Sequence, residues 1–298
     1  MQRKTPAYKR QKLALALLEA FGGSLSKTDF QKLLFLYTTM HTDDKPYTFV
    51  PYFYGCYSFQ AHSDLETMQK YGFLSSDTAI YSKNNTFIGS FLNFLDEHDR
   101  NKLKSFAKKF QDLKGKNLIA YVYNHFPYFT IHSQIAKDYL DQATIDSYKP
   151  QDKEAQFFTI GYEGKTVELY INELIKNNIH VLIDVRKNAM SMKFGFSKNF
   201  LKRTLENMGI QYIHIPELGI ESENRQTLNT LDDYKILFKE YEKGTLRNAA
   251  VYLDKLFSLY KQYNRVAIMC YEKDIQMCHR GCIAKEIEKK HKITIQHI

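Results

Sequence analysis

Phe157-Phe158-Thr159-Ile160-Gly161 is a short apolar run closed by a glycine. A helical pattern follows at Val167–Lys176, and a β-branched run follows at residues 181–185. Two apolar runs separated by a helix are typical of a βαβ unit, in which parallel strands are joined through the helix. This part of the chain therefore predicts the beginning of a parallel α/β sheet.

The same alternation continues to the last residue. Further strands are expected at 211–215, 266–270 and 293–298, and helices at 200–208, 234–241, 249–263 and 278–289. Strands that alternate with helices imply right-handed crossovers and a parallel sheet with helices on both faces. We therefore expect residues 151–298 to form a Rossmann-like α/β domain.

Residues 1–150 have a different pattern and are expected to form a mostly helical domain. A helical pattern at 9–21 stops at Gly22-Gly23, and Ser26 with Asp29 resembles a capping box before a second helix. Two short helices joined by a glycine turn fit either a helix-turn-helix or a small helical bundle. The polar stretch 148–153 is expected to link the two domains.

The overall composition is that of a globular protein with a basic balance. Of 298 residues, 44% are hydrophobic and 25% are charged. No apolar run approaches the roughly 18 residues of a membrane helix, so no membrane partner is expected. The 4 cysteines do not suggest a disulfide framework, which favours a cytoplasmic location. The net charge of +9 favours a polyanionic partner.

The densest basic patch lies on an amphipathic helical pattern in the N-terminal half. Its basic residues are Arg100, Lys102, Lys104, Lys108, Lys109, Lys114 and Lys116. A solvated helix face and a nucleic-acid footprint both explain this pattern. On the second interpretation, Lys104, Lys108 and Lys109 are the candidate nucleic-acid-binding residues.

Ionisable residues follow the predicted strands of the C-terminal half. They are Tyr162 and Glu163, Asp184 and Arg186, His214 and Glu217, Cys270 and Glu272, and then Cys278, His279 and Arg280. The carboxyl ends of parallel strands open onto one edge of the sheet, where ligands bind. We therefore expect these residues around one pocket, although some of them could simply cap helices or satisfy loops.

The residue types suggest separate roles at this edge. The candidate catalytic residues are Glu163, Asp184, His214 and His279, with a carboxylate as general acid or base and a histidine as proton shuttle. The candidate substrate-binding residues are Tyr162, Arg186, Glu272, Cys278 and Arg280. The two arginines would hold phosphate. For Asp184 and Arg186, an internal ion pair is the alternative.

The glycine-containing loop after the first strand does not match the standard nucleotide motifs. Thr159 stands where a Walker loop needs glycine, and Glu163 stands where the dinucleotide fingerprint needs one. The loop could still bind an anion through its backbone N–H groups, or it could be a plain turn.

Cysteines and a histidine form the most reactive group in the chain. Cys270, Cys278 and Cys282 are separated by seven and three residues, which are not the Cys-x2-Cys pairs that zinc prefers. No cofactor is therefore expected, and zinc held by these three cysteines and His279 is the alternative. A nucleophilic Cys278 would need its pKa lowered from about 8.5 to about 7; simple packing is the other interpretation.

The C-terminal half resembles the family called domain of unknown function 488. The resemblance rests on Thr159-Ile160-Gly161-Tyr162-Glu163-Gly164, Leu182-Ile183-Asp184-Val185-Arg186, Gly209-Ile210-x-Tyr212-x-His214-x-Pro216-x-Leu218-Gly219, and Met269-Cys270-x-Glu272 followed by Cys278-His279-Arg280. It implies a Rossmann-type layer and an active or ligand site, without a particular reaction.

The N-terminal half resembles the Panacea, or SocA-like, antitoxin-associated domain. The resemblance rests on Lys32-Leu33-Leu34-Phe35-Leu36-Tyr37, Phe49-Val50-Pro51-Tyr52-x-Tyr54-Gly55-x-Tyr57-Ser58 and Asp64-Leu65-Glu66. It implies contact with a partner protein, toxin neutralisation and phage defence. Cys56 stands where such a domain is expected to have proline.

Three hypotheses for the function remain open. The first is an enzyme that hydrolyses a nucleotide, or a plain or modified base in nucleic acid, in phage defence or DNA processing. The second is a non-catalytic nucleotide or nucleic-acid sensor, or an adaptor, in a defence or toxin–antitoxin system. The third is a thiol- or zinc-dependent protein that uses Cys270 and Cys278.

Overall fold

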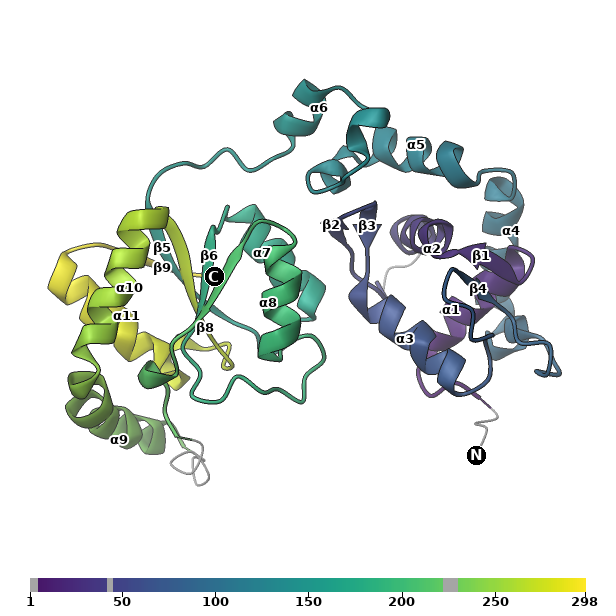
Figure 1. The fold of residues 1–298 in the computed structure, drawn as a ribbon. Coiled ribbons are helices and arrows are strands. Elements are labelled where there is room, and N and C mark those ends of the chain that lie inside the picture. The colour runs from purple at the N-terminus through teal and green to yellow at the C-terminus, as the bar shows by residue number, and fades with distance from the viewer. Residues whose placement is uncertain (1–4, 42–44, 222–229) are drawn as a thin grey trace. The chain divides into compact units, whose positions relative to one another are not determined.

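A computed structural model describes residues 5–41, 45–221 and 230–298. The chain divides into two compact units, Met1–Lys149 and Pro150–Ile298 (Figure 1). The division falls one residue before the boundary expected from the sequence.

The N-terminal unit consists mainly of helices, as predicted. Its α-helices are α1 (Lys9–Ala20), α2 (Lys27–His41), α3 (Phe59–Lys70), α4 (Glu97–Phe110), α5 (Gly115–His125) and α6 (Gln142–Ser147). Its 3-10 turns are η1 (Phe91–Phe94), η2 (Pro127–Thr130) and η3 (Ala136–Asp138). Two small antiparallel sheets accompany them, one pairing β1 (Ser24–Ser26) with β4 (Ile80–Ser82) and the other pairing β2 (Val50–Tyr52) with β3 (Gly55–Tyr57).

Local sequence signals explain the first two helices. Gly22 and Gly23 end α1 with φ angles of 93° and 78°, values that glycine adopts without strain. The Ser26 hydroxyl accepts the Asp29 N–H at 3.0 Å at the start of α2. The strand β1 lies between α1 and α2 and pairs with β4, so a strand separates these two helices.

The C-terminal unit contains a sheet of five parallel strands, which confirms the predicted fold class. The strands are β5 (Gln156–Gly161), β6 (Val181–Asp184), β7 (Gln211–His214), β8 (Arg265–Cys270) and β9 (Ile295–His297). They lie in the order β7-β6-β8-β5-β9. The α-helices are α7 (Val167–Lys176), α8 (Lys198–Glu206), α9 (Leu231–Tyr241), α10 (Ala250–Tyr263) and α11 (Arg280–His291). Short turns are η4 (Pro216–Leu218), the π-helical η6 (Glu242–Leu246) and η7 (Ile275–Met277).

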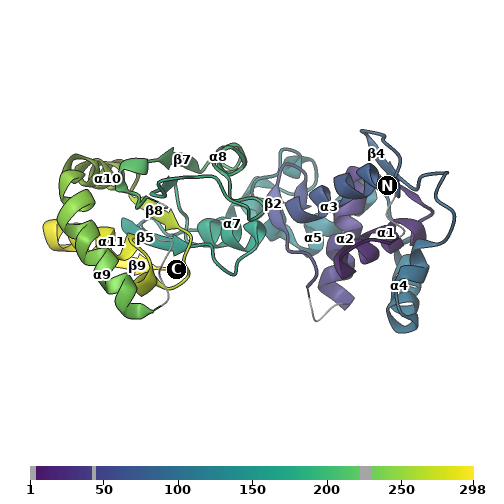
Figure 2. The same ribbon diagram turned by 90° about the horizontal axis from the view of Figure 1, so that it is seen from below.

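Helices cover both faces of this sheet. Figures 1 and 2 show α7 and α8 on one side and α10 and α11 on the other. Every residue of β6 and β8 is buried, as expected for central strands that are covered on both faces. Among the residues that the structure describes, none of the helices has the length and apolar character needed to cross a bilayer.

The strand register brings the predicted site residues to one edge. Gly161 at the end of β5 pairs with Cys270 at the end of β8. Asp184 at the end of β6 lies opposite Met269 of β8 and opposite His214 of β7. The loops that follow these four strands are therefore neighbours.

Candidate functional site

A buried ion pair lies at the end of β6. Asp184 is fully buried, and its carboxylate accepts Arg186 Nε at 2.9 Å and Arg186 Nη2 at 2.5 Å. The Tyr212 hydroxyl from β7 donates to the same carboxylate at 2.5 Å. Burial and the neighbouring Asp184 carboxylate raise the pKa of Tyr212, so this phenol remains a proton donor at neutral pH.

The Arg186 guanidinium is fully engaged by the protein. Its Nη1 donates to the Tyr162 hydroxyl at 2.9 Å and to the Phe196 carbonyl at 3.0 Å. Its Nη2 also approaches the Ala189 carbonyl at 3.5 Å, so each of its N–H groups has a protein acceptor. This arrangement is the internal ion pair that the sequence analysis gave as the alternative. Arg186 has no N–H group left to donate to a phosphate.

Two histidines bind successive carbonyls of the loop after β6. His214 Nε2 lies 2.8 Å from the Arg186 carbonyl, and its Nδ1 lies 3.2 Å from Lys198 Nζ. The buried His279 places Nε2 3.0 Å from the Val185 carbonyl. Since a carbonyl only accepts, both Nε2 atoms carry the proton. The two histidines therefore reach the same edge, where they anchor one loop.

Glu163 ties the loop after β5 to the loop after β8, and Arg280 holds the loop after β8. Glu163 Oε2 accepts the Lys273 N–H at 2.9 Å. Arg280 donates from Nη1 to the Glu272 carbonyl at 2.5 Å and from Nη2 to the Lys273 carbonyl at 2.9 Å. A Cβ on Gly161 would lie 2.0 Å from the Glu272 carbonyl oxygen, so only glycine permits this approach.

Arg280 is a buried cation whose donors are only partly satisfied. It is 2% exposed, and its Nε has no hydrogen-bond partner. Among the residues that the structure describes, no carboxylate lies within ion-pair distance of it. In this structure Arg280 positions the Glu272–Lys273 backbone.

Cys270, Cys278 and His279 come together below these loops. Their sulfur and nitrogen atoms all lie within 4.8 Å of one another, and all three residues are buried. Cys270 Sγ lies 3.6 Å from His279 Nδ1 and 3.3 Å from Glu272 Oε2. Glu272 is only partly buried, so its carboxylate lies at the outer side of the cluster.

Cys282 is separate from this cluster, although the sequence grouped it there. Its thiol faces the carboxylate of Glu242, and burial raises its pKa to about 12. The four-ligand zinc set expected as an alternative is therefore not formed by these four residues. Burial also raises the pKa of Cys278, which is opposite to the shift that a nucleophilic thiolate requires.

Sequence reasoning missed a partly exposed surface at the same edge. Lys193 Nζ donates to the Tyr162 carbonyl at 2.8 Å, and the Tyr271 ring packs edge-on against Tyr162 at 5.3 Å. Tyr271 is 44% exposed, and Met192 beside Lys193 is fully exposed. The position of Tyr271 directly after a strand is a sequence signal that could have identified this residue. Lys193 offers no such signal, because the loop that carries it is irregular.

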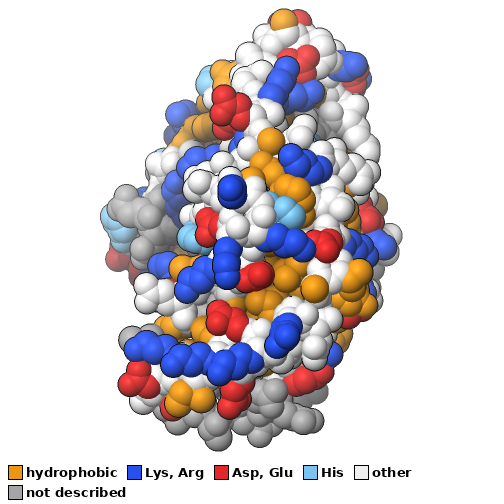
Figure 3. All heavy atoms as spheres, turned by 90° about the vertical axis from the view of Figure 1, so that its left-hand side faces the viewer, with side chains coloured by type: hydrophobic (Ala, Val, Ile, Leu, Met, Phe, Trp, Pro, Cys, Tyr) orange, Lys and Arg blue, Asp and Glu red, His pale blue; other side chains and the backbone are white. Residues whose placement is uncertain are grey.

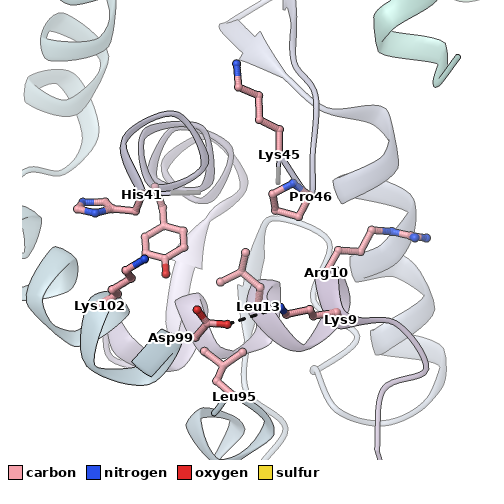
Figure 4. A pocket seen from close by; sticks show the side chains of 10 residues that line it. Lys9, Arg10, Leu13, His41, Lys45, Pro46, Leu95, Asp99 and Lys102 are labelled. Carbon is pink, nitrogen blue, oxygen red and sulfur yellow. Dashed lines mark ion pairs between the residues drawn. The ribbon is translucent and has the colours of Figure 1, made fainter. Parts of the chain in front are cut away.

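Two cavities lie among the described residues of the N-terminal unit. One, of about 440 Å³, lies between α1, α2 and α4 and is shown in Figure 4. Two of its cations are already paired, Lys9 with Asp99 at 3.9 Å and Arg10 with Asp64 at 2.7 Å. The candidate nucleic-acid-binding lysines, Lys104, Lys108 and Lys109, are all exposed on α4.

A buried lysine lines the second cavity, which has about 280 Å³. Lys32 is 1% exposed and donates to the Tyr54 carbonyl at 2.5 Å. Burial lowers its pKa. The sequence placed Lys32 in a motif but gave no sign of its burial, since a single lysine in an apolar run is usually exposed at a helix surface.

Comparison with protein families bears on the C-terminal unit. Residues 166–287 match the family model described as Domain of unknown function DUF488. The matched DUF488 region includes the ends of β6, β7 and β8 and the start of α11, and therefore Asp184, Arg186, His214 and the cysteine cluster. The C-terminal half is thus similar to DUF488, whose description assigns no activity. No curated protein and no solved structure matches the chain.

Proposed function

We propose that the C-terminal unit is a hydrolase that acts on a nucleotide or on a plain or modified base in nucleic acid. The observation that supports this proposal is the surface where Lys193, Tyr271 and Glu163 lie around Tyr162. It combines a cation, an exposed aromatic ring and an exposed carboxylate at the edge of a parallel sheet where ligands bind.

The two lysines at this edge fit a phosphate. Burial lowers the pKa of Lys193 and of Lys165, while Glu163 raises that of Lys193. Partly desolvated ammonium groups interact more strongly with an anion than fully hydrated ones do. Lys193 and Lys165 therefore take the phosphate-holding role that the sequence gave to Arg186 and Arg280.

The aromatic and acidic groups complete the proposed site. Tyr271 offers an exposed face on which a base can stack. Glu163 is exposed, and its Oε2 is fixed by the Lys273 N–H, so the carboxylate is oriented for holding water next to a bound substrate. Asp184 is not used, because Arg186 and Tyr212 occupy its carboxylate.

Turnover by the full chain tests this proposal. We expect hydrolysis of one member of a panel of nucleotides and of plain and modified DNA. Glu163→Gln should lower kcat at least tenfold, Lys193→Ala should raise KM, and the exposed Lys176→Ala at the far end of α7 should leave both unchanged. Binding without consumption of any panel member would instead favour the sensor or adaptor.

The basic residues outside this edge provide suitable controls. Figure 3 shows the face over α9, α10 and α11, where Lys and Arg side chains are spread among acidic and apolar ones. Neutralising lysines on this face should therefore not change turnover. A loss of activity there equal to that of Lys193→Ala would contradict the proposed site.

For the N-terminal unit we propose a role in delivering the target, through nucleic acid or through a partner protein. The exposed lysines of α4 favour nucleic acid. The resemblance to the Panacea domain favours a protein, as does Tyr54, which is 53% exposed in the β2–β3 turn. Pull-down of the full chain with and without nuclease treatment separates the two.

A further inference from the structure

Cys270, Cys278 and His279 come from two elements that the fold brings into contact. Cys270 ends β8, whereas Cys278 and His279 lie between η7 and the first residue of α11. Their three donor atoms lie within 4.8 Å of one another in a buried place. With Zn–S near 2.3 Å and Zn–N near 2.0 Å, tetrahedral ligands are about 3.5 Å apart. Cys270 Sγ and His279 Nδ1 are separated by 3.6 Å.

The His279 ring is oriented as a metal ligand would be. Its Nε2 donates to the Val185 carbonyl at 3.0 Å, which places the proton on that nitrogen. The other nitrogen, Nδ1, then presents its lone pair toward the sulfur of Cys270. Zinc-bound histidines usually donate their second ring N–H to a carbonyl or carboxylate in this way.

The charges in the cluster also favour a cation. Two thiols lie together in the cluster, and the Glu272 carboxylate lies 3.3 Å from one of them, Cys270; a thiol becomes negative when it loses its proton. A divalent ion stabilises deprotonated thiols directly. Thiolate together with imidazole favours zinc over magnesium or calcium, which prefer oxygen ligands.

We propose that Cys270, Cys278 and His279 bind one zinc ion, with the fourth position taken by water. Glu272 Oε2 lies 3.3 Å from Cys270 Sγ but is not among the donor atoms that all lie within 4.8 Å of one another, so it stays outside the ligand set. The ion would hold the loop of residues 271–279 onto the end of β8. This zinc site goes beyond the proposed hydrolase and does not depend on it.

Zinc content measured by mass spectrometry tests the site on the full chain, purified under reducing conditions. We expect about one zinc ion per chain. Cys278→Ser and His279→Asn should lower the zinc content about tenfold or more. Cys282→Ala is the matched control, since this buried cysteine lies outside the cluster, and it should retain zinc.

A second measurement uses the wild-type chain, so that the test does not depend on variants that fail to fold. Cobalt added to the metal-free wild-type chain should give a thiolate-to-cobalt charge-transfer band, which a site without sulfur ligands lacks. Zinc should also raise the Tm of the wild type and of Cys282→Ala. A wild-type chain without zinc and without the cobalt band, or a disulfide between Cys270 and Cys278 under reducing conditions, would overturn the proposal. Equal zinc loss in Cys282→Ala would do the same.

Discussion

Arg186 and Asp184 form an ion pair in which Nε and Nη2 of the guanidinium lie 2.9 and 2.5 Å from the two carboxylate oxygens. Only one residue separates them, and both are buried. The pair fixes the start of the loop after β6, and this loop carries Lys193 of the proposed substrate surface.

Asp184→Asn should destabilise the C-terminal unit strongly. The substitution leaves the Arg186 guanidinium buried without its counter-ion, which costs about 3–5 kcal/mol. Urea unfolding followed by circular dichroism measures the effect. Tyr212→Phe, which removes one hydrogen bond from the same carboxylate, should cost only about 1–2 kcal/mol. Equal losses in the two variants would contradict the structural role of the ion pair.

Gly161→Ala should displace the loop after β8. The new methyl group would meet the Glu272 carbonyl oxygen, so that loop must move or the chain must lose about 2–4 kcal/mol of unfolding free energy. Thermal unfolding checks this expectation. Gly244→Ala is the control, because a Cβ there meets no atom within 4 Å, and it should leave the Tm unchanged or higher.

His132 should make the N-terminal unit sensitive to mild acid. Burial, and then Lys149, lower its pKa to about 4. The unfolded chain therefore binds a proton at higher pH than the folded one, so this contribution to stability is complete above about pH 6.5 and falls as the pH drops toward 4. After allowance for partial exposure, we expect a loss of about 2 kcal/mol.

Denaturant unfolding of His132→Gln between pH 7 and 4 checks this prediction. The variant should lose less stability than the wild type over that range. His98→Gln serves as the control, because His98 is exposed on α4, and it should behave as the wild type does. If His132→Gln and the wild type lose the same free energy, the acid sensitivity has another origin.

If α4 binds nucleic acid, charge removal should change the salt dependence of binding. Replacing Lys104, Lys108 and Lys109 with glutamine should reduce the slope of log K against log salt by about 0.9 for each phosphate of duplex DNA that the helix no longer neutralises. Fluorescence anisotropy at several salt concentrations measures the slope. The same change at the exposed Lys285 and Lys289 of α11 should leave it unchanged. An unchanged slope in the α4 variant would contradict a role of α4 in nucleic-acid binding.

The fold of the C-terminal half could be predicted because strand patterns alternate with helical patterns along its sequence. The five predicted strands all occur. β5, β6 and β8 are short apolar runs, whereas β7 and β9 mix polar and apolar residues. The last helix begins at Arg280 and not at 278, because Cys278 and His279 connect it to the short turn η7, which ends at Met277. Spacing along the chain showed no sign of such a turn.

The roles of single residues at the edge were harder to predict. Sequence identifies Arg186 as an arginine after a strand, but the number of acceptors around it depends on the Phe196 and Ala189 carbonyls of the irregular loop that follows. Cys282 looked equivalent to Cys278, yet Cys282 lies inside α11 with its thiol facing Glu242, whereas Cys278 precedes that helix. The roles of Arg186 and Cys282 thus depend on the direction of their side chains, which the order of residues in the sequence does not give.

The edge strand β9 affects where a tag can be fused to the chain. β9 pairs with β5 over only three positions, from Ile295 to His297, and it covers the backbone groups of Phe157 and Thr159. Clipping these last residues, or crowding them with a bulky fusion, would leave β5 as an open edge available to a second molecule. Fusions at the two termini should therefore behave differently, with tags at the C-terminus producing more self-association.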